Sequence, residues 1–256
     1  MNCLELFCGT KSFGKVANKL GHNVISVDLL EKFNPTHCCN ILDFDYKQYD
    51  KNKFDIIWAS PPCQYYSHLQ SSRLNKVDKN GVKFTREVWE EYMKNSDKIV
   101  AKTLEIINYF KPELWFMENP QTGKLKTRNV VKDLNYYDVD YCMYSNYGYK
   151  KRTRIWTNKL DWNNLLCDGK GTCGNMIEIP TNNAIHSGTK QPIKSKKRTI
   201  HFFPIGDPNK TKQIIRYLHK NNLGNIDQKK ITKGKNLSLE ERYRVPENLI
   251  YSLLLD

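Results

Sequence analysis

The order of apolar and loop-forming residues in the first thirty positions leaves few possible folds. An apolar stretch from Met1 to about Phe7 runs into Cys8-Gly9-Thr10, and apolar residues then recur at helical spacing as far as Gly21. A second apolar stretch, Asn23–Asp28, ends in an acid. This order predicts a strand, a tight loop, a helix and a second strand that carries a carboxylate at its tip. Nucleotide-like ligands bind at such carboxyl ends of strands.

The chain beyond this unit continues the alternation of strands and helices. Further strands are expected at 55–59 and 114–117, with a helix at about 89–110 between them. The Tyr- and Val-rich stretches 139–144 and 153–156 suggest an antiparallel hairpin that closes the sheet. The pattern predicts the α/β class, with a largely parallel sheet covered on both faces.

The charge of the chain is concentrated in one region. The formal net charge is +14, and the stretch from Lys190 to Lys235 holds thirteen Lys and Arg residues against Asp207 and Asp227. Residues 159–236 also lack long periodic segments, so they are expected to form a small basic lobe. Residues 1–158 would form the main domain, completed by an amphipathic helix within 237–256. A strongly basic lobe favours a polyanionic partner such as nucleic acid.

Two loops of the main domain are candidates for chemistry. Pro61 and Pro62 stiffen the loop after the 55–59 strand, so that Cys63 would project from a rigid segment where a nucleophile is usually placed. Glu118 follows the 114–117 strand in the same way, and a buried carboxylate there needs a partner or a task. Taken singly, the cysteine could be inert core packing and the glutamate a helix cap.

Four motifs together resemble the cytosine-C5 DNA methyltransferase family, in its compact phage or viral form. They are Leu4-Glu-Leu-Phe-Cys-Gly-Thr, Pro61-Pro-Cys63, Glu118-Asn-Pro120 and Tyr147-Gly-Tyr-Lys-Lys-Arg-Thr-Arg-Ile155. They occur in the order of the family and, with their connecting elements, cover residues 2 to about 158. The resemblance implies a Rossmann-like sheet that binds S-adenosyl-L-methionine, with residues 159–236 as a target-recognition lobe.

The resemblance also implies a reaction. Cys63 would add to carbon 6 of a flipped-out cytosine, which activates carbon 5 to take the methyl group from S-adenosyl-L-methionine. Glu118, protonated or sharing a proton with ring nitrogen 3, would stabilise the charge on the ring. Arg154 would hold the carbonyl oxygen of the base, and Arg152 would support the pocket or contact a phosphate.

The same resemblance implies the binding residues. Those expected to contact the cofactor are Phe7, Cys8, Gly9, Thr10, Ser12, Phe13, Asp28, Leu29, Asn40, Ile41 and Pro61. Those expected to contact DNA are Ser67, Lys194, Lys196, Lys197 and Arg198. Three positions depart from the family pattern: Ser12 lies near a usual glycine, Asn40 stands where an acid is expected, and Lys150 replaces a glutamine.

The expected partner is double-stranded DNA, bound by a monomer without an obligate protein partner. No run reaches the roughly 18 apolar residues of a membrane span, and no signal peptide is evident, so an intracellular location is expected. A viral protein would act in the cytoplasm or nucleus of the host cell. Cys167 and Cys173, with His186, could bind a metal, but five residues between two cysteines is not a usual zinc spacing. The sequence therefore predicts no metal.

Three other functions are compatible with parts of this pattern. The first is cytosine-5 methylation of RNA, because a transfer-RNA methyltransferase can share the Pro-Pro-Cys and glutamate motifs. The second is a non-catalytic DNA-binding derivative, against which Cys63, Glu118 and Arg154 argue together. The third is an exocyclic amino-methyltransferase, since Ser60-Pro-Pro resembles its motif. Cys63 stands in the place of the aromatic residue of that motif, and Glu118 has no role there.

Overall fold

The computed structural model describes residues 1–79, 81–180, 197–201, 216, 220 and 243–255. The chain divides into two compact units. The first consists of Met1–Val139, Arg152–Asn164 and Tyr243–Asp256, and the second of Asp140–Lys151 and Leu165–Arg242. The bounds of these units differ from the expected ones: residues 140–151 and 237–242, expected in the main domain, group with the second unit, and residues 159–164, expected in the lobe, group with the first. The functional division into catalytic and target-recognition parts stays a prediction.

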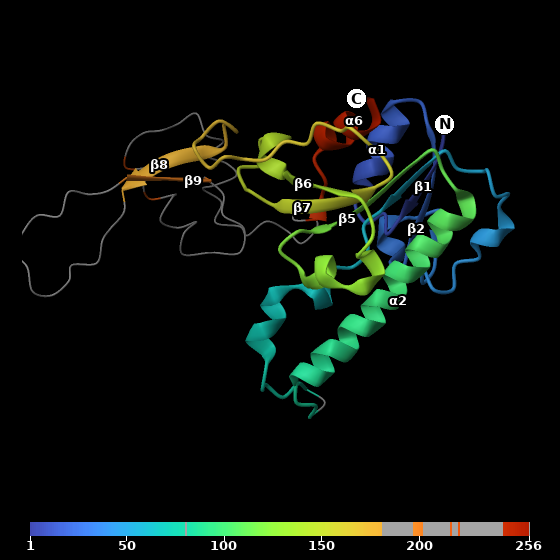
Figure 1. The fold of residues 1–256 in the computed structure, drawn as a ribbon, viewed down its shortest axis with the longest axis horizontal. Coiled ribbons are helices and arrows are strands. Elements are labelled where there is room, and N and C mark those ends of the chain that lie inside the picture. The colour runs from blue at the N-terminus through green and yellow to red at the C-terminus, as the bar shows by residue number, and fades with distance from the viewer. Residues whose placement is uncertain (80, 181–196, 202–215, 217–219, 221–242, 256) are drawn as a thin grey trace, which may run out of the picture. The chain divides into compact units, whose positions relative to one another are not determined.

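A seven-stranded sheet forms the centre of the first unit (Figure 1). Its order is β3-β2-β1-β4-β5-β7-β6, in which β3, β2, β1, β4 and β5 pair in parallel and β7 is antiparallel to β5. This confirms the expected α/β, Rossmann-like fold. The strands are β1 (Asn2–Leu6), β2 (Asn23–Asp28), β3 (His37–Cys38), β4 (Ile56–Ala59), β5 (Leu114–Pro120), β6 (Tyr136–Asp140) and β7 (Arg152–Thr157). The two-residue strand β3 was not predicted, because so short a segment has no periodicity.

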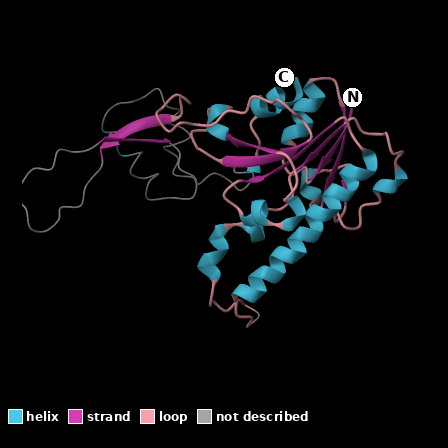
Figure 2. Cartoon of the chain, viewed as in Figure 1, coloured by secondary structure: helices cyan, strands magenta, loops and turns pink. Residues whose placement is uncertain are grey.

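Helices cover both faces of the sheet (Figure 2). The α-helices are α1 (Ser12–Lys19), α2 (Arg86–Phe110) and α6 (Glu247–Leu255). Short 3-10 helices occupy the connections: η1 (Glu31–Phe33), η2 (Tyr46–Gln48), η3 (Gln64–Tyr66), η4 (His68–Arg73), η5 (Lys124–Thr127), η6 (Asn129–Val131) and η7 (Tyr141–Met143). Helix α2 begins three residues before its expected start, since the Thr85 side chain accepts a hydrogen bond from the Val88 N–H and caps the helix. Pro246 directly precedes α6, and its carbonyl oxygen accepts a hydrogen bond from the Ile250 N–H.

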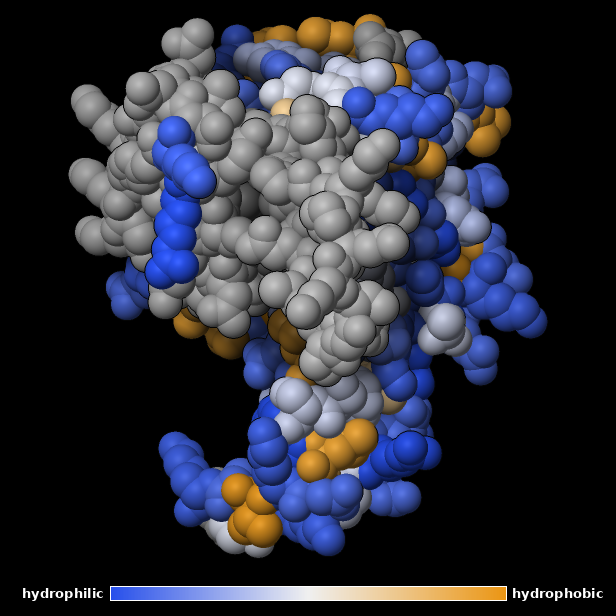
Figure 3. Space-filling view, turned by 90° about the vertical axis from the view of Figure 1, so that its left-hand side faces the viewer, coloured by the Kyte–Doolittle hydropathy of each residue, from blue (hydrophilic) through white to orange (hydrophobic). Residues whose placement is uncertain are grey.

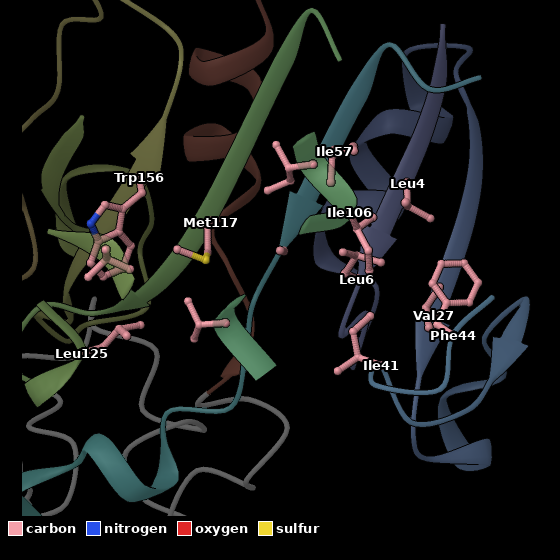
Figure 4. Close-up of a cluster of buried hydrophobic side chains, with 14 of the residues drawn as sticks. Leu4, Leu6, Val27, Ile41, Phe44, Ile57, Ile106, Met117, Leu125 and Trp156 are labelled. Carbon is pink, nitrogen blue, oxygen red and sulfur yellow. The ribbon is translucent and has the colours of Figure 1, made fainter. Parts of the chain in front are cut away.

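Alternating residues of the strands supply the two layers of the core. One layer contains Leu4, Leu6, Ile57 and Met117, which pack with Ile106 of α2 (Figure 4). On the other face, the ring of Phe13 from α1 stacks on Trp58 of β4 with ring centroids 5.4 Å apart. Because both faces of these strands are covered, apolar residues occupy consecutive positions, as in Ile56–Ala59 of β4.

The second unit has a small sheet of its own. Strands β8 (Met176–Pro180) and β9 (Lys197–His201) pair antiparallel, and the register places His201 opposite Met176. The 3-10 helix η7 belongs to the same unit. The short strands agree with the absence of long periodic segments in this part of the sequence.

On the face shown in Figure 3, the described residues are mostly hydrophilic, with small hydrophobic patches between them. Among the described residues, no helix is both long and apolar enough to cross a membrane.

A buried carboxyl group lies within the sheet. Glu5 of β1 is only 2% exposed and lies beside the backbone N–H groups of Phe13 and Gly14, which favour its charged form. A Cβ atom on Gly14 would lie 2.6 Å from Glu5 Oε2, so a larger residue at this position would displace the carboxyl group. Burial raises the pKa of Glu5 to about 7, although these backbone N–H groups and nearby Lys11 and Lys15 oppose the shift.

We expect Glu5 to make folding stability depend on pH. The raised pKa means that the folded state binds the proton more tightly than the unfolded chain, so stability falls as pH rises from about 4.5 to about 7. The full loss would be about 3 kcal/mol. Urea unfolding of the wild type and Glu5→Gln between pH 4.5 and 8 should show this decline in the wild type only. Glu91→Gln, an exposed control, should keep the wild-type slope. Parallel curves for wild type and Glu5→Gln would contradict the assignment.

Candidate active site

Three loops of the first unit leave the carboxyl ends of neighbouring parallel strands. Residues 7–11 follow β1, residues 60–67 follow β4, and Glu118 lies near the end of β5. In this sheet the chain adds β2 and β3 on one side of β1, and then adds β4 and β5 on the other side. The direction in which strands are added therefore reverses between β1 and β4. In open α/β sheets ligands bind outside the carboxyl ends of the strands at such a reversal. The expected cofactor loop and Cys63 both lie at this edge.

The loop after β1 is held by Asp28 at the end of β2. Phe7, Gly9 and Lys11 have φ angles of 59°, 47° and 57°, so the backbone turns sharply between strand and helix. Asp28 Oδ2 accepts a hydrogen bond from the Gly9 N–H at 2.9 Å, and Asp28 Oδ1 accepts one from the Leu30 N–H at 2.9 Å. The structure thus brings together the two features that the sequence assigned to a nucleoside cofactor.

Ser12 connects this loop to the C-terminal segment. Its Oγ accepts a hydrogen bond from the Val245 N–H at 3.1 Å and lies 3.3 Å from Thr10 Oγ1. A salt bridge of 2.7 Å between Lys19 and Glu247 adds a second link between α1 and α6. The serine near a usual glycine position therefore has a structural role, which is to hold the segment that leads into α6.

The other expected cofactor residues have different environments. Cys8 is 5% exposed, and burial raises its pKa to about 12, so it is a packing residue rather than a reactive thiol. Ile41 is also buried, whereas Leu29 is 66% exposed. Asn40 Oδ1 accepts a hydrogen bond from the Leu42 N–H at 3.1 Å, so the oxygen expected to read an adenine amino group already has a local donor.

The Cys63 loop is connected directly to the glutamate motif. Asn119 Nδ2 donates a buried hydrogen bond of 2.8 Å to the carbonyl oxygen of Pro61. Cys63 is half-buried and directly precedes η3, and its carbonyl oxygen accepts a hydrogen bond from the Tyr66 N–H at 3.1 Å. Glu118, one residue before Asn119, is 7% exposed. The motif with Cys63 thus follows β4, and the motif with Glu118 ends β5. These two strands are adjacent, and a buried hydrogen bond joins the two motifs.

A charged network supports the same loop, and the sequence did not reveal it. The buried Tyr66 donates its hydroxyl hydrogen to Asp97 Oδ1 of α2 at 2.8 Å. Arg128 pairs with the same Asp97 at 2.6 Å and with Glu90 at 2.7 Å. The residues lie about thirty positions apart in the chain, so no local motif could have linked them. Their effect is to anchor the residues that follow Cys63 to α2.

The two arginines of the fourth motif lie on β7. Arg154 stands opposite Asn119 in the β5–β7 pair, while Ile155 stands opposite Glu118. The guanidinium of Arg154 donates hydrogen bonds to both carboxylate oxygens of Asp138, at 2.8 and 3.0 Å, and lies over the Tyr136 ring. Burial disfavours its charge, but Asp138 outweighs this and the pKa of Arg154 lies above its ordinary value. Arg152 begins the strand, and its carbonyl oxygen accepts a hydrogen bond from the Gln121 N–H.

The expected DNA contacts are only partly within the described residues. Ser67 caps η4 by accepting a hydrogen bond from the Leu69 N–H at 3.2 Å. Lys197 and Arg198 lie in β9, opposite Pro180 and Ile179. Lys194 and Lys196 lie outside the described residues.

The second unit gathers side chains of a metal-binding kind. Cys167 and Cys173 lie close to Cys142 and His201. His186, the partner considered from the sequence, lies outside the described residues. Cys142 and His201 could not be linked to this pair from the sequence, because they are 25 or more positions away from Cys167 and no spacing rule covers such a separation.

Comparison with known proteins shows similarity to one family. Residues 1–245 match the family model described as C-5 cytosine-specific DNA methylase. A curated relative, "Probable DNA (cytosine-5)-methyltransferase" from Frog virus 3 (isolate Goorha), is 36% identical over 183 residues, which is 71% of this chain and 81% of the relative.

Solved structures show a more distant similarity. A methyltransferase structure from Entamoeba histolytica, EhMeth, is 14% identical over 99% of this chain and 96% of its own, with a TM-score of 0.47. A putative DNA modification methyltransferase encoded within a prophage of E. coli is 16% identical over 61% of this chain and 46% of its own, with a TM-score of 0.42. S. pombe Dnmt2 is 14% identical over 65% of this chain and 51% of its own, with a TM-score of 0.40. The match thus covers about half of the latter two chains.

Proposed function

The chain belongs to the C-5 cytosine-specific DNA methylase family, and from this premise we propose that it transfers a methyl group from S-adenosyl-L-methionine to carbon 5 of a cytosine in double-stranded DNA. The observation that carries the proposal is the hydrogen bond from Asn119 to the Pro61 carbonyl oxygen. It connects the segment that holds Cys63 to the segment that holds Glu118. A nucleophile and an acid from two distant motifs are thereby brought to one edge of the sheet.

Cys63 is the proposed nucleophile. Carbon 5 of cytosine is a weak donor, so the thiolate first forms a bond to carbon 6 and places electron density on the ring. Carbon 5 would then take the methyl group as the bond between that group and the sulfonium sulfur breaks, which leaves S-adenosyl-L-homocysteine, and a base or water would remove the proton from carbon 5. The electron pair then re-forms the ring double bond as the bond between sulfur and carbon 6 breaks. The short loop between Ala59 and η3 holds Cys63 for this attack, and Tyr66 and Asp97 anchor the loop.

Glu118 is proposed to stabilise the ring during the attack. The addition of a thiolate at carbon 6 develops negative charge that extends to ring nitrogen 3, and a carboxyl proton placed there lowers the barrier. The low exposure of Glu118 supports this role, because a hydrogen bond is stronger where water is excluded. Its neighbour Asn119 fixes the strand end against the Pro61 carbonyl.

The residues at the ends of β1 and β2 fit S-adenosyl-L-methionine. Gly9 has only the Phe7 carbonyl oxygen within 4 Å of where a Cβ would be, so a ligand could approach its backbone. Asp28 is held beside this glycine and can accept the two ribose hydroxyl groups. When bound, the cofactor supplies a methyl group on a positively charged sulfur, which is a reactive electrophile. The loop from Phe7 to Ser12 and Asp28 would hold it, with Leu29, Ile41 and Phe13 as apolar neighbours.

The arginines are proposed to assist base binding. Arg154 would contact the carbonyl oxygen of the base and Arg152 a phosphate or the pocket wall. The pairing of Arg154 with Asp138 implies that this carboxylate would share the guanidinium with the base. A cytosine within a duplex does not expose carbon 6, so the base is proposed to flip out before reaction. The basic residues of 159–236 are proposed to contact the phosphates.

Direct product analysis tests the proposal. The purified chain is incubated with S-adenosyl-L-methionine and, separately, with mixed-sequence duplex DNA and with RNA, followed by digestion and mass spectrometry of the nucleosides. We expect 5-methyl-deoxycytidine from the DNA and no methylated cytidine from the RNA. Parallel calorimetric titration with S-adenosyl-L-methionine should show binding that Asp28→Ala weakens.

Other outcomes would redirect the proposal. Methylation of RNA alone would reassign the substrate to RNA. Methylation of an exocyclic amino group would remove the role given to Cys63. Binding of cofactor and DNA without any product, on DNA that covers all short sequence contexts, would favour a non-catalytic derivative.

A further inference from the structure

Four potential metal ligands converge in the second unit. The Sγ atoms of Cys142, Cys167 and Cys173 and a ring nitrogen of His201 all lie within 4.8 Å of one another. His201 Nε2 lies 3.8 Å from Cys167 Sγ and 3.7 Å from Cys173 Sγ. A tetrahedral zinc site with ordinary Zn–S and Zn–N bonds has edges of about 3.6 to 3.8 Å. The distances from His201 Nε2 to the two sulfur atoms are therefore close to the edges of such a site.

We propose that Cys142, Cys167, Cys173 and His201 bind one structural zinc ion in the second unit. Three thiolates and one imidazole are a ligand set that selects zinc, in the tetrahedral geometry of closed structural sites. The site is independent of the proposed methyl transfer, since none of its residues belongs to the loops that carry Cys63 and Glu118. It goes beyond the family assignment, which concerns the reaction alone.

A tight turn explains how Cys173 returns to Cys167. Between these two residues, Gly169 and Gly171 have φ angles of 76° and 102°, which are left-handed conformations that favour glycine. Asp168 Oδ1 accepts hydrogen bonds from the Lys170 N–H at 2.8 Å and the Thr172 hydroxyl at 3.0 Å. The two glycines and the hydrogen bonds to Asp168 thus fold the five residues between Cys167 and Cys173 into a tight turn. The spacing that argued against zinc in the sequence therefore allows both sulfurs to lie at one site.

Asn175 holds the loops that carry two of the ligands. This side chain is 3% exposed, and its Nδ2 donates hydrogen bonds to the carbonyl oxygens of Cys142 at 2.8 Å, Ser145 at 2.9 Å and Cys173 at 2.9 Å. Its Oδ1 accepts one from the Gly148 N–H at 3.0 Å. The next residue, Met176, stands opposite His201 in the β8–β9 pair. These contacts therefore hold the segments of Cys142, Cys173 and His201 close together, although the three residues lie far apart in the sequence.

Charged neighbours fit the charge of a zinc centre. Three thiolates, a neutral imidazole and a zinc ion carry one net negative charge. Lys150 Nζ donates to the Cys167 carbonyl oxygen at 3.2 Å and lies 3.4 Å from the buried carboxylate of Asp140. Asp140 in turn accepts a hydrogen bond from the Cys167 N–H at 2.9 Å. Such outer groups orient metal ligands, and they give a role to the lysine that replaces the glutamine of the family.

A disulfide is the main alternative for these cysteines. A disulfide would join two of the three sulfurs and would leave the third sulfur and His201 without a function. None of the eight cysteines forms a disulfide in the structure. The convergence of all four ligand atoms favours a metal.

Metal analysis of the full chain, purified without chelator, tests the proposal. We expect about one zinc ion per chain by plasma mass spectrometry. Cys142→Ser and His201→Asn should lose most of this zinc, whereas Cys38→Ser, which changes an exposed cysteine of the first unit, should keep it. His201→Cys should also keep it, because a fourth thiolate can replace the imidazole. This rescue separates loss of a ligand from loss of folding.

Cobalt and thiol measurements give a readout that does not depend on activity. Replacing zinc by Co²⁺ should produce thiolate-to-cobalt charge-transfer bands and the visible bands of a tetrahedral centre, absent in Cys142→Ser. In denaturant with EDTA, all eight cysteines should react as thiols. Wild-type protein without stoichiometric zinc, retention of full zinc by both Cys142→Ser and His201→Asn, or two fewer reactive thiols would each overturn the proposal.

Discussion

Cys63→Ala should abolish methyl transfer while the protein remains folded. Without the thiolate, nothing adds to carbon 6, and carbon 5 stays too weak a donor to take a methyl group. We expect turnover to fall by roughly 10⁴-fold or more. Cofactor binding should persist, because Cys63 lies in the loop after β4, whereas the proposed cofactor residues lie mainly in the loops after β1 and β2. The measurement is single-turnover methylation of duplex DNA beside calorimetric titration with S-adenosyl-L-methionine.

A matched control and a trapping assay make this result specific. Cys38→Ala changes a cysteine that is exposed on β3, so its turnover should equal that of the wild type. Duplex DNA that contains 5-fluorocytosine should form a stable covalent complex with the wild type, because the fluorine at carbon 5 cannot leave as a proton does. Cys63→Ala should form none. Normal turnover in Cys63→Ala, or loss of its thermal unfolding transition, would make the cysteine a structural residue.

Glu118→Gln is expected to have the second largest effect. The amide keeps the size of the side chain but cannot supply a carboxyl proton to the ring, so we expect kcat to fall by roughly 10²- to 10⁴-fold. DNA affinity should change little, since the stabilised charge develops only during the attack. The measurement is kcat and KM on the same duplex, together with the rate of the 5-fluorocytosine trap, which should fall in parallel.

The control for Glu118→Gln lies before the start of the same strand. Glu113 is exposed and directly precedes β5, so Glu113→Gln makes the same chemical change away from the loops. Its kcat should match the wild type. A Glu118→Gln enzyme with normal kcat and a raised KM would indicate a role in binding rather than in stabilising the ring.

The site divides into parts that were predictable from sequence and parts that were not. Cys63 and Glu118 were predicted at one sheet edge because each directly follows or ends an apolar strand, and parallel strands present their carboxyl ends together. The partner of Arg154 was not predictable. Asp138 lies on β6, and it reaches Arg154 only because β6 is the neighbour of β7 at the edge of the sheet. The network of Tyr66, Asp97 and Arg128 was missed for a similar reason. Asp97 lies on helix α2, about thirty residues after the loop residue Tyr66 that it contacts.

The sequence by itself determined the α/β class, the order of the main strands and helices, and the two candidate reactive residues. These depend on local periodicity and on chain direction, which a single segment carries. Only the tertiary structure decided which side chains meet across long separations: Asn119 with Pro61, Ser12 with Val245, and the three cysteines with His201. Such contacts depend on loop geometry and on strand register, because a shift of one residue would turn Asn119 of β5 or His201 of β9 to the opposite face of its sheet.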